Sequence, residues 1–155
     1  MTFEITLQAR EERRRALRYT CPKDCVGEID ESDSLWMLEK ILDRAQEENK
    51  TAVLFMWTRS CGRCKEIKDK LSASCKLQQN AHDILLLTHE LRDSRDDLSP
   101  IAQLYRVKHV PSYLVFQGGA LKEVLYGTGV GSILHTIKNK YLRLSHNHQS
   151  RENNM

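Results

Sequence analysis

The sequence lacks a long apolar run, a large excess of one charge and an even number of cysteines. No stretch reaches the ~18 to 20 consecutive apolar residues of a membrane-spanning helix. The 24 Lys and Arg against 21 Asp and Glu give a formal charge of only +3, whereas a dedicated nucleic-acid surface requires a marked basic excess. We therefore expect neither a membrane span nor nucleic-acid binding.

Five cysteines are an odd number, and a secreted disulfide scaffold would normally pair all of them. No apolar stretch follows a basic start, as a secretory signal peptide would require. The arginine-rich beginning also contains Glu4, Glu11 and Glu12, which are unusual in a mitochondrial presequence. These features predict a reducing compartment, the cytoplasm first and an organelle as the alternative.

The length of 155 residues suits one domain with short extensions. We expect a charged, partly helical N-terminal extension over 1–22, a folded domain over 23–144 and a polar, disordered tail over 145–155. The extension is a candidate contact for a protein assembly partner.

The domain is organised around residues 51–64, an apolar run that leads into Cys61 and Cys64. The run has the composition of a strand buried on both faces, and a helix is predicted over 65–71. At the start of a helix, the free N–H groups and the helix dipole favour an anion. Arg63 adds a positive charge, so we predict a lowered pKa for Cys61, with Cys64 as the thiol that resolves a mixed disulfide.

A helix is also predicted between residue 34 and Lys50, capped within Ser32-Asp33-Ser34. Its apolar side chains recur every three or four residues, and Trp36 and Met37 widen the buried face. The expected buried positions are Leu35, Leu38, Leu42 and Ala45.

Further strands and helices complete an alternating pattern. Strands are predicted at 26–30 and 83–91, helices at 98–105 and 132–144, and a hairpin of 113–117 with 121–126 around Gly118-Gly119.

Trp57, the Cys61-Gly-Arg-Cys64 pair and Val110-Pro111 before the hairpin follow one another in the order and spacing of a known family. Over roughly residues 25–143 the chain resembles the thioredoxin family. The resemblance implies an α/β fold with a central mixed sheet of four to five strands flanked by helices on both faces. It also implies a cis Val110–Pro111 bond lying against the cysteine pair.

The resemblance further implies a thiol–disulfide oxidoreductase that acts on protein disulfides. Cys61 and Cys64 would be its catalytic residues, Arg63 would tune the thiolate, and Trp57, Ser60, Val110 and Pro111 would form the substrate platform. The implied partners are a protein with a disulfide or thiol and a thiol reductant or reductase. No cofactor and no metal are expected. A glutaredoxin-like use of glutathione fits the hairpin after Pro111 less well.

Three positions depart from the family pattern. Ser60 replaces a tryptophan, and Gly62-Arg63 replaces Gly-Pro between the cysteines, which should make the pair more oxidising. Phe55 occupies the place of a buried acid that accepts the proton of the resolving cysteine, so that step should be slow. His89, on the neighbouring strand, is the candidate substitute base.

Two alternatives remain open. The domain could instead be a scaffold or binding subunit of a larger assembly, with little or no turnover. Cys21 and Cys25 could form a regulatory disulfide, bind zinc together with Cys61 and Cys64, or be unrelated thiols. Cys75 is expected to be an inert, buried side chain.

Overall fold

The computed structural model describes residues 26–77 and 83–142. The extension at 1–22, the tail at 145–155, Cys21 and Cys25 lie outside these ranges, so the expectations for them stay untested. None of the helices within the described ranges is long and apolar enough to cross a membrane.

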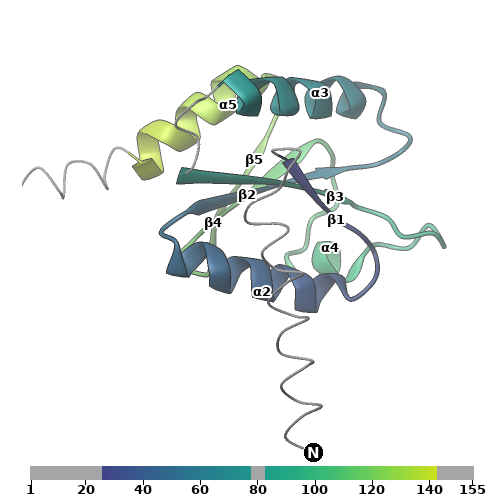
Figure 1. Ribbon diagram of the computed structural model, residues 1–155. Helices are drawn as coiled ribbons and strands as arrows, with labels where there is room; N and C mark the ends of the chain where they lie inside the picture. The colour runs from purple at the N-terminus through teal and green to yellow at the C-terminus, as the bar shows by residue number, and fades with distance from the viewer. Residues whose placement is uncertain (1–25, 78–82, 143–155) are drawn as a thin grey trace, which may run out of the picture.

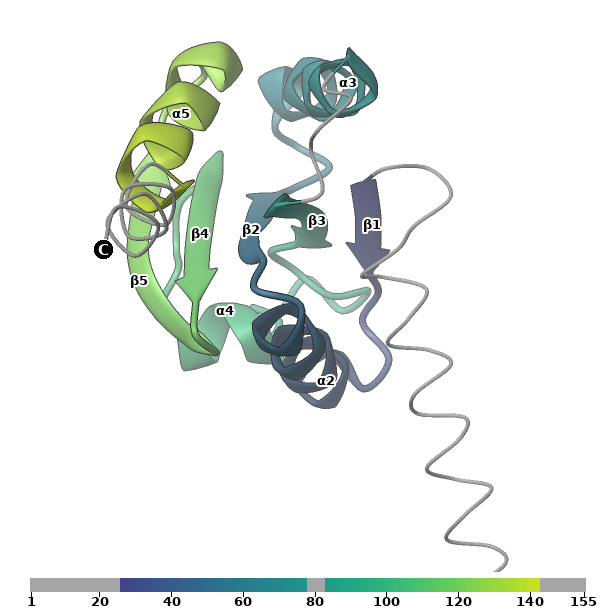
Figure 2. The same ribbon diagram turned by 60° about the vertical axis from the view of Figure 1, so that its left-hand side comes forward.

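A five-stranded mixed sheet forms the centre of the domain. The strands are β1 (Val26–Ile29), β2 (Thr51–Trp57), β3 (Ile84–Glu90), β4 (Ser112–Gln117) and β5 (Ala120–Tyr126), and their spatial order is β1-β3-β2-β4-β5. β1, β3 and β2 are mutually parallel, whereas β4 runs antiparallel to β2 and β5 antiparallel to β4. Figure 2 shows this order across the sheet. The sheet confirms the predicted fold class.

Helices cover both faces of the sheet. α3 (Gly62–Leu77) and α5 (Val130–Ile137) lie on one face, and α2 (Ser34–Glu47) and α4 (Pro100–Leu104) on the other (Figure 1). The last helix continues beyond Ile137 as a π-helical turn, η2 (Lys138–Leu142), so the predicted single helix over 132–144 consists of two pieces.

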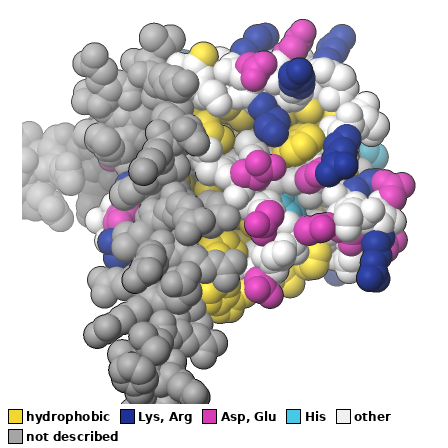
Figure 3. Space-filling model, turned by 45° about the vertical axis from the view of Figure 1, so that its right-hand side comes forward, with side chains coloured by type: hydrophobic (Ala, Val, Ile, Leu, Met, Phe, Trp, Pro, Cys, Tyr) yellow, Lys and Arg dark blue, Asp and Glu magenta, His cyan; other side chains and the backbone are white. Residues whose placement is uncertain are grey.

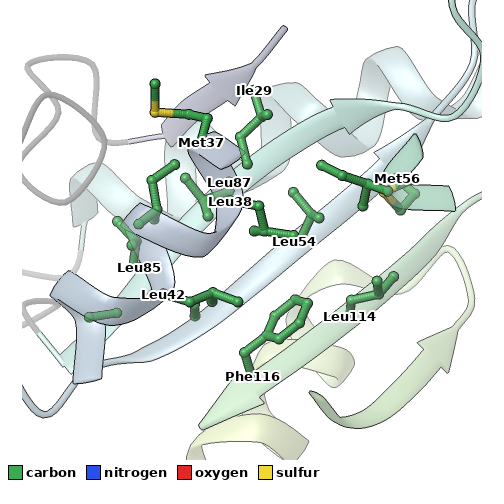
Figure 4. Close-up of a cluster of buried hydrophobic side chains, with 14 of the residues drawn as sticks. Ile29, Met37, Leu38, Leu42, Leu54, Met56, Leu85, Leu87, Leu114 and Phe116 are labelled. Atoms are coloured by element: carbon green, nitrogen blue, oxygen red, sulfur yellow. The ribbon is translucent and has the colours of Figure 1, made fainter. Parts of the chain in front are cut away.

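Alternation along the strands divides the core into two clusters. In β2, Leu54 and Met56 belong to the cluster under α2 and α4, whereas Val53 and Phe55 belong to the cluster under α3 and α5. Six of the seven β2 residues are buried, as predicted for a strand covered on both faces. Figure 4 shows the first cluster, with side chains from α2 and four strands; those labelled are Ile29, Met37, Leu38, Leu42, Leu54, Met56, Leu85, Leu87, Leu114 and Phe116.

The start of α2 differs from the prediction. Asp33 is the N-cap residue, but it has a left-handed conformation (φ 53°) and its side chain makes no capping hydrogen bond. Leu35 is 40% exposed, while Met37 and Ile41 are buried. Leu38, Leu42 and Ala45 are buried as expected, so Leu35, in the first turn of the helix, is the one of these positions that the sheet does not cover.

Candidate active site

Cys61 and Cys64 form a disulfide where β2 gives way to α3. Their Cα atoms are 5.4 Å apart, and the backbone N–H of Cys64 donates to the carbonyl of Cys61. α3 begins at Gly62, directly after Cys61, as the sequence predicted. Cys61 is partly exposed, whereas Cys64 is completely buried. Only the Cys61 sulfur can therefore meet a large partner.

The Val110–Pro111 peptide bond is cis, as the resemblance implied. Met56 pairs with Ser112, and Ser112 pairs with Tyr126. The end of β2, the start of β4 and the end of β5 are therefore neighbours at one edge of the sheet. Val110 and Cys61 pack against the same core cluster, so the cis bond and the disulfide lie on adjoining loops.

The other expected platform residues differ in exposure. Ser60 is exposed, and its hydroxyl lies 3.2 Å from that of Thr58. Arg63 is exposed beside the disulfide. Trp57 is half-buried against the core, and the Lys68 ammonium lies 3.8 Å from its ring centroid, a cation–π geometry. One face of the Trp57 ring is thus covered by α3.

The interior around Cys64 is mainly apolar. Cys64, Phe55 and Tyr113 belong to one buried cluster, and the Phe55 and Tyr113 ring centroids are 5.1 Å apart. The Tyr113 hydroxyl is buried and without a hydrogen-bond partner, and burial raises the pKa of Tyr113 to about 12. A phenol that holds its proton so tightly is no base at neutral pH.

His89 cannot replace the missing acid. Alternate residues of a strand lie on the same face of the sheet, so His89 shares a face with Leu85 and Leu87 of β3. These two residues belong to the cluster under α2 and α4, on the face opposite to Cys64. Nδ1 lies 2.7 Å from the Ile29 carbonyl oxygen and Nε2 lies 2.9 Å from Ser99 Oγ. Burial lowers the pKa of His89. The prediction that His89 could serve as the substitute base was wrong, because the alternation of side chains along β3 places it on the face of the sheet opposite to Cys64.

Three features near the site were not predicted from the sequence. They are the Lys68–Trp57 contact, the unpartnered Tyr113 hydroxyl and the ion pair between Arg59 Nε and Glu90 Oε1 at 3.1 Å. Each depends on how different elements of the fold pack together, which the sequence pattern does not specify. Within the described ranges no group of three or more His, Cys, Asp or Glu side chains is placed to hold a metal ion. The thiols of Cys61 and Cys64 are joined to each other, and nothing in the structure tests the zinc alternative for Cys21 and Cys25.

The chain is 31% identical over 104 residues to the thioredoxin-like 4 protein of Arabidopsis thaliana, described as chloroplastic, and 30% identical over 104 residues to its counterpart in Oryza sativa subsp. japonica. Both matches include 66% of this chain. The chain is a thioredoxin-like protein. It spans about half the length of these curated relatives, 50% and 47% respectively. No family model matches the sequence.

Solved structures agree with the thioredoxin-like fold. The long form of thioredoxin f from spinach chloroplast superimposes with a TM-score of 0.60 at 21% identity, covering 81% of this chain and 91% of that one. Thioredoxin NaTrxh from Nicotiana alata superimposes with a TM-score of 0.59 at 20% identity, covering 75% of this chain and 92% of that one. The chain thus combines a cysteine pair with the thioredoxin-like fold.

Proposed function

We propose that this thioredoxin-like domain carries out thiol–disulfide exchange with protein substrates through Cys61 and Cys64. The observation that carries the proposal is the asymmetry of the pair: Cys61 is partly exposed, whereas Cys64 is fully buried. An exposed attacking sulfur followed by a protected resolving sulfur is what a two-step exchange requires.

In the reducing direction the thiolate of Cys61 attacks one sulfur of the substrate disulfide. An S–S bond forms between Cys61 and the substrate, and the other substrate sulfur leaves as a thiolate. Cys64 then loses its proton and attacks the Cys61 sulfur, which releases the second substrate sulfur and forms the Cys61–Cys64 disulfide. Two electrons pass to the substrate, so a dithiol reductant or reductase must return them. Arg63 would stabilise the attacking thiolate, and Trp57, Ser60, Val110 and Pro111 would border the substrate.

A reductase partner has support from one structural neighbour, thioredoxin f2 in complex with ferredoxin:thioredoxin reductase, at a TM-score of 0.58 and 24% identity. The two curated relatives are described as chloroplastic. We therefore propose an organelle as the location; the cytoplasmic expectation has no support from these relatives. The segment 1–22 stays a proposed contact for an assembly partner.

The decisive experiment traps the mixed disulfide. Cys64→Ser removes the resolving thiol, so substrates should stay attached to Cys61, and the double variant Cys61→Ser/Cys64→Ser is the control. Disulfide-linked partners that appear on non-reducing gels with the first variant and not with the second support exchange. Equal labelling of both would contradict it.

A scaffold role is the second candidate, favoured by the apolar surroundings of Cys64. Phe55 supplies no proton acceptor, and the Tyr113 phenol holds its proton. Turnover of insulin disulfides with a dithiol reductant separates the two roles: a scaffold gives none above the double-cysteine control.

A further inference from the structure

The loops around the disulfide carry positive charge and no carboxylate. Segments 58–63, 106–111 and 127–129 meet at the sheet edge where Met56, Ser112 and Tyr126 pair. Their charged side chains are Arg59, Arg63, Arg106 and Lys108, all exposed, and none of the three segments contains Asp or Glu.

Most of this charge is unneutralised. Arg59 has an ion pair with Glu90. Within the described ranges, no ion pair involves Arg63, Arg106 or Lys108. Carboxylates lie instead on the connection after β3, at Asp93, Asp96 and Asp97. In Figure 3, Asp and Glu side chains lie in the middle of the face shown and also among the Lys and Arg side chains at its upper and right-hand edges. The positive charge of the three loops is therefore a local feature of the domain.

A hollow adjoins the same loops. It has a volume of about 540 Å³ and is lined by Leu98, Ala102, Val107 and Tyr126 together with the polar residues Gln103, Arg106, Lys108 and His109. Tyr126, which contributes to this lining, is 57% exposed. The lining thus combines an apolar wall with two cations.

We propose that this surface docks an acidic segment of a partner protein. One apolar side chain of the segment occupies the hollow, its carboxylates lie against Arg106, Lys108 and Arg63, and its sulfur reaches Cys61. The last contact rests on the function proposed above; the docking does not. Complementary charge raises the rate of encounter and excludes partners of the wrong sign.

Two other occupants fit less well. Residues 10–18 of this chain contain five arginines and two glutamates, so the N-terminal segment has the same sign as the loops. A nucleic acid would bring a long run of phosphates toward Asp93, Asp96 and Asp97, and like charges repel it. A short acidic peptide meets the cations alone.

The test uses a matched pair of synthetic peptides, each with one leucine and one cysteine linked to a small thiol. One carries glutamates and the other glutamines at the same positions. The reduced domain should react about tenfold or more faster with the glutamate peptide at low salt. The difference should vanish in about 1 M salt, where the Debye length is about 3 Å.

Variants locate the effect. Lys108→Glu and Arg106→Glu should each remove most of the glutamate advantage. Lys122→Glu, the same charge change at an exposed site on β5, should retain it. Replacing the peptide leucine by serine should lower the reaction rate of the wild-type protein more than it lowers that of the Tyr126→Ala variant. Equal rates for both peptides, an equal loss in Lys122→Glu, or stronger competition by single-stranded oligothymidine than by the glutamate peptide would each overturn the proposal.

Failure of the two proposals can be told apart. The uncharged probe hydroxyethyl disulfide reports thiol chemistry without docking, and the peptide rate of each variant is divided by its own rate with this probe to remove any change in thiol reactivity. If that probe does not react, the proposed thiol–disulfide exchange is refuted. Docking is then measured separately, as binding in fluorescence polarisation of peptides with serine in place of the cysteine. Preference for the glutamate peptide then supports docking; no preference refutes it.

Discussion

Replacing Phe55 by aspartate tests whether an apolar interior limits the resolving step. Phe55 is 1% exposed and packs in one cluster with Cys64 and Tyr113. An acid at this position would be buried, with a raised pKa, and could accept the proton of Cys64 as that thiol attacks. We therefore expect Phe55→Asp to accelerate the release of substrate from the mixed disulfide.

The substitution has a large cost in stability. Truncating a buried phenylalanine costs about 3–5 kcal/mol, and the lost ring contact with Tyr113 is a part of it. Burying a polar group adds about 1–3 kcal/mol, which a hydrogen bond from the unpartnered Tyr113 hydroxyl would reduce by about 1 kcal/mol. The net loss of about 3–7 kcal/mol is a large share of the ~5–15 kcal/mol of a typical domain, so rates must be normalised to the folded fraction.

The matched control is Phe55→Asn, which has nearly the same shape and cost but accepts no proton. Insulin reduction and rapid-quench measurement of the resolving step would be run on both variants, with the folded fraction taken from circular dichroism. The aspartate variant should resolve at least about tenfold faster than the asparagine variant, since general-base catalysis contributes about 10²–10⁴-fold where geometry is optimal. The difference should grow as pH rises through the raised pKa of the introduced carboxyl. Equal rates in folded samples would refute the reasoning and strengthen the scaffold role.

Three further predictions concern the dipeptide, a buried histidine and the hairpin. Arg63→Pro should make the Cys61–Cys64 disulfide harder to reduce, because it removes the cation beside the thiolate; equilibration with glutathione measures this, and an unchanged or more oxidising potential contradicts it. Burial lowers the folded-state pKa of His89 below 6.5, so the unfolded state binds more protons and the free energy of unfolding falls as pH drops below about 6.5; in urea titrations His89→Gln should flatten this slope, and parallel slopes would speak against it. Gly119→Ala should lower the free energy of unfolding by about 1–2 kcal/mol in thermal unfolding, since φ is +79° and the added Cβ would lie 2.9 Å from Gln46 Oε1. Gly131→Ala is the control and should cost nothing, because its Cβ would meet nothing within 4 Å.

The predictable part of the fold came from local signals. The apolar run at 51–57, the hairpin glycines and the order of strands and helices depend on residues close together in the chain, and all appear where expected. The cap of α2 falls at Asp33, within the predicted Ser32-Asp33-Ser34, but without the side-chain hydrogen bond that these residue types favour. Leu35 was misplaced because it lies in the first turn, at the margin of an apolar face whose limits the sequence pattern alone does not define.

The site needed one more kind of information, the pairing between strands. The sequence places His89 on the strand beside Phe55, and the hydropathy of both strands predicts that each is buried on two faces. A strand buried on both sides does not reveal which residues share a face with a given partner, since a shift of one position exchanges the faces. The observed register pairs Phe55 with Thr88, and Met56 with His89, and thereby removes the imidazole from the chemistry.

This register also constrains how the proton of Cys64 can leave. None of the described residues that are buried is Asp or Glu. On the face of the sheet that holds Cys64, the buried cluster includes the phenols of Tyr113 and Tyr141, and burial raises the pKa of both. The remaining way out is toward Cys61, the partly exposed side of the pair, through water or a group of the bound partner. Resolution would then depend on which partner is docked: one that brings a carboxylate to the loops around Cys61 could also supply the base that Phe55 does not. A faster resolving step with the glutamate peptide than with its glutamine counterpart, at saturating peptide, would distinguish this base from a simple gain in encounter rate.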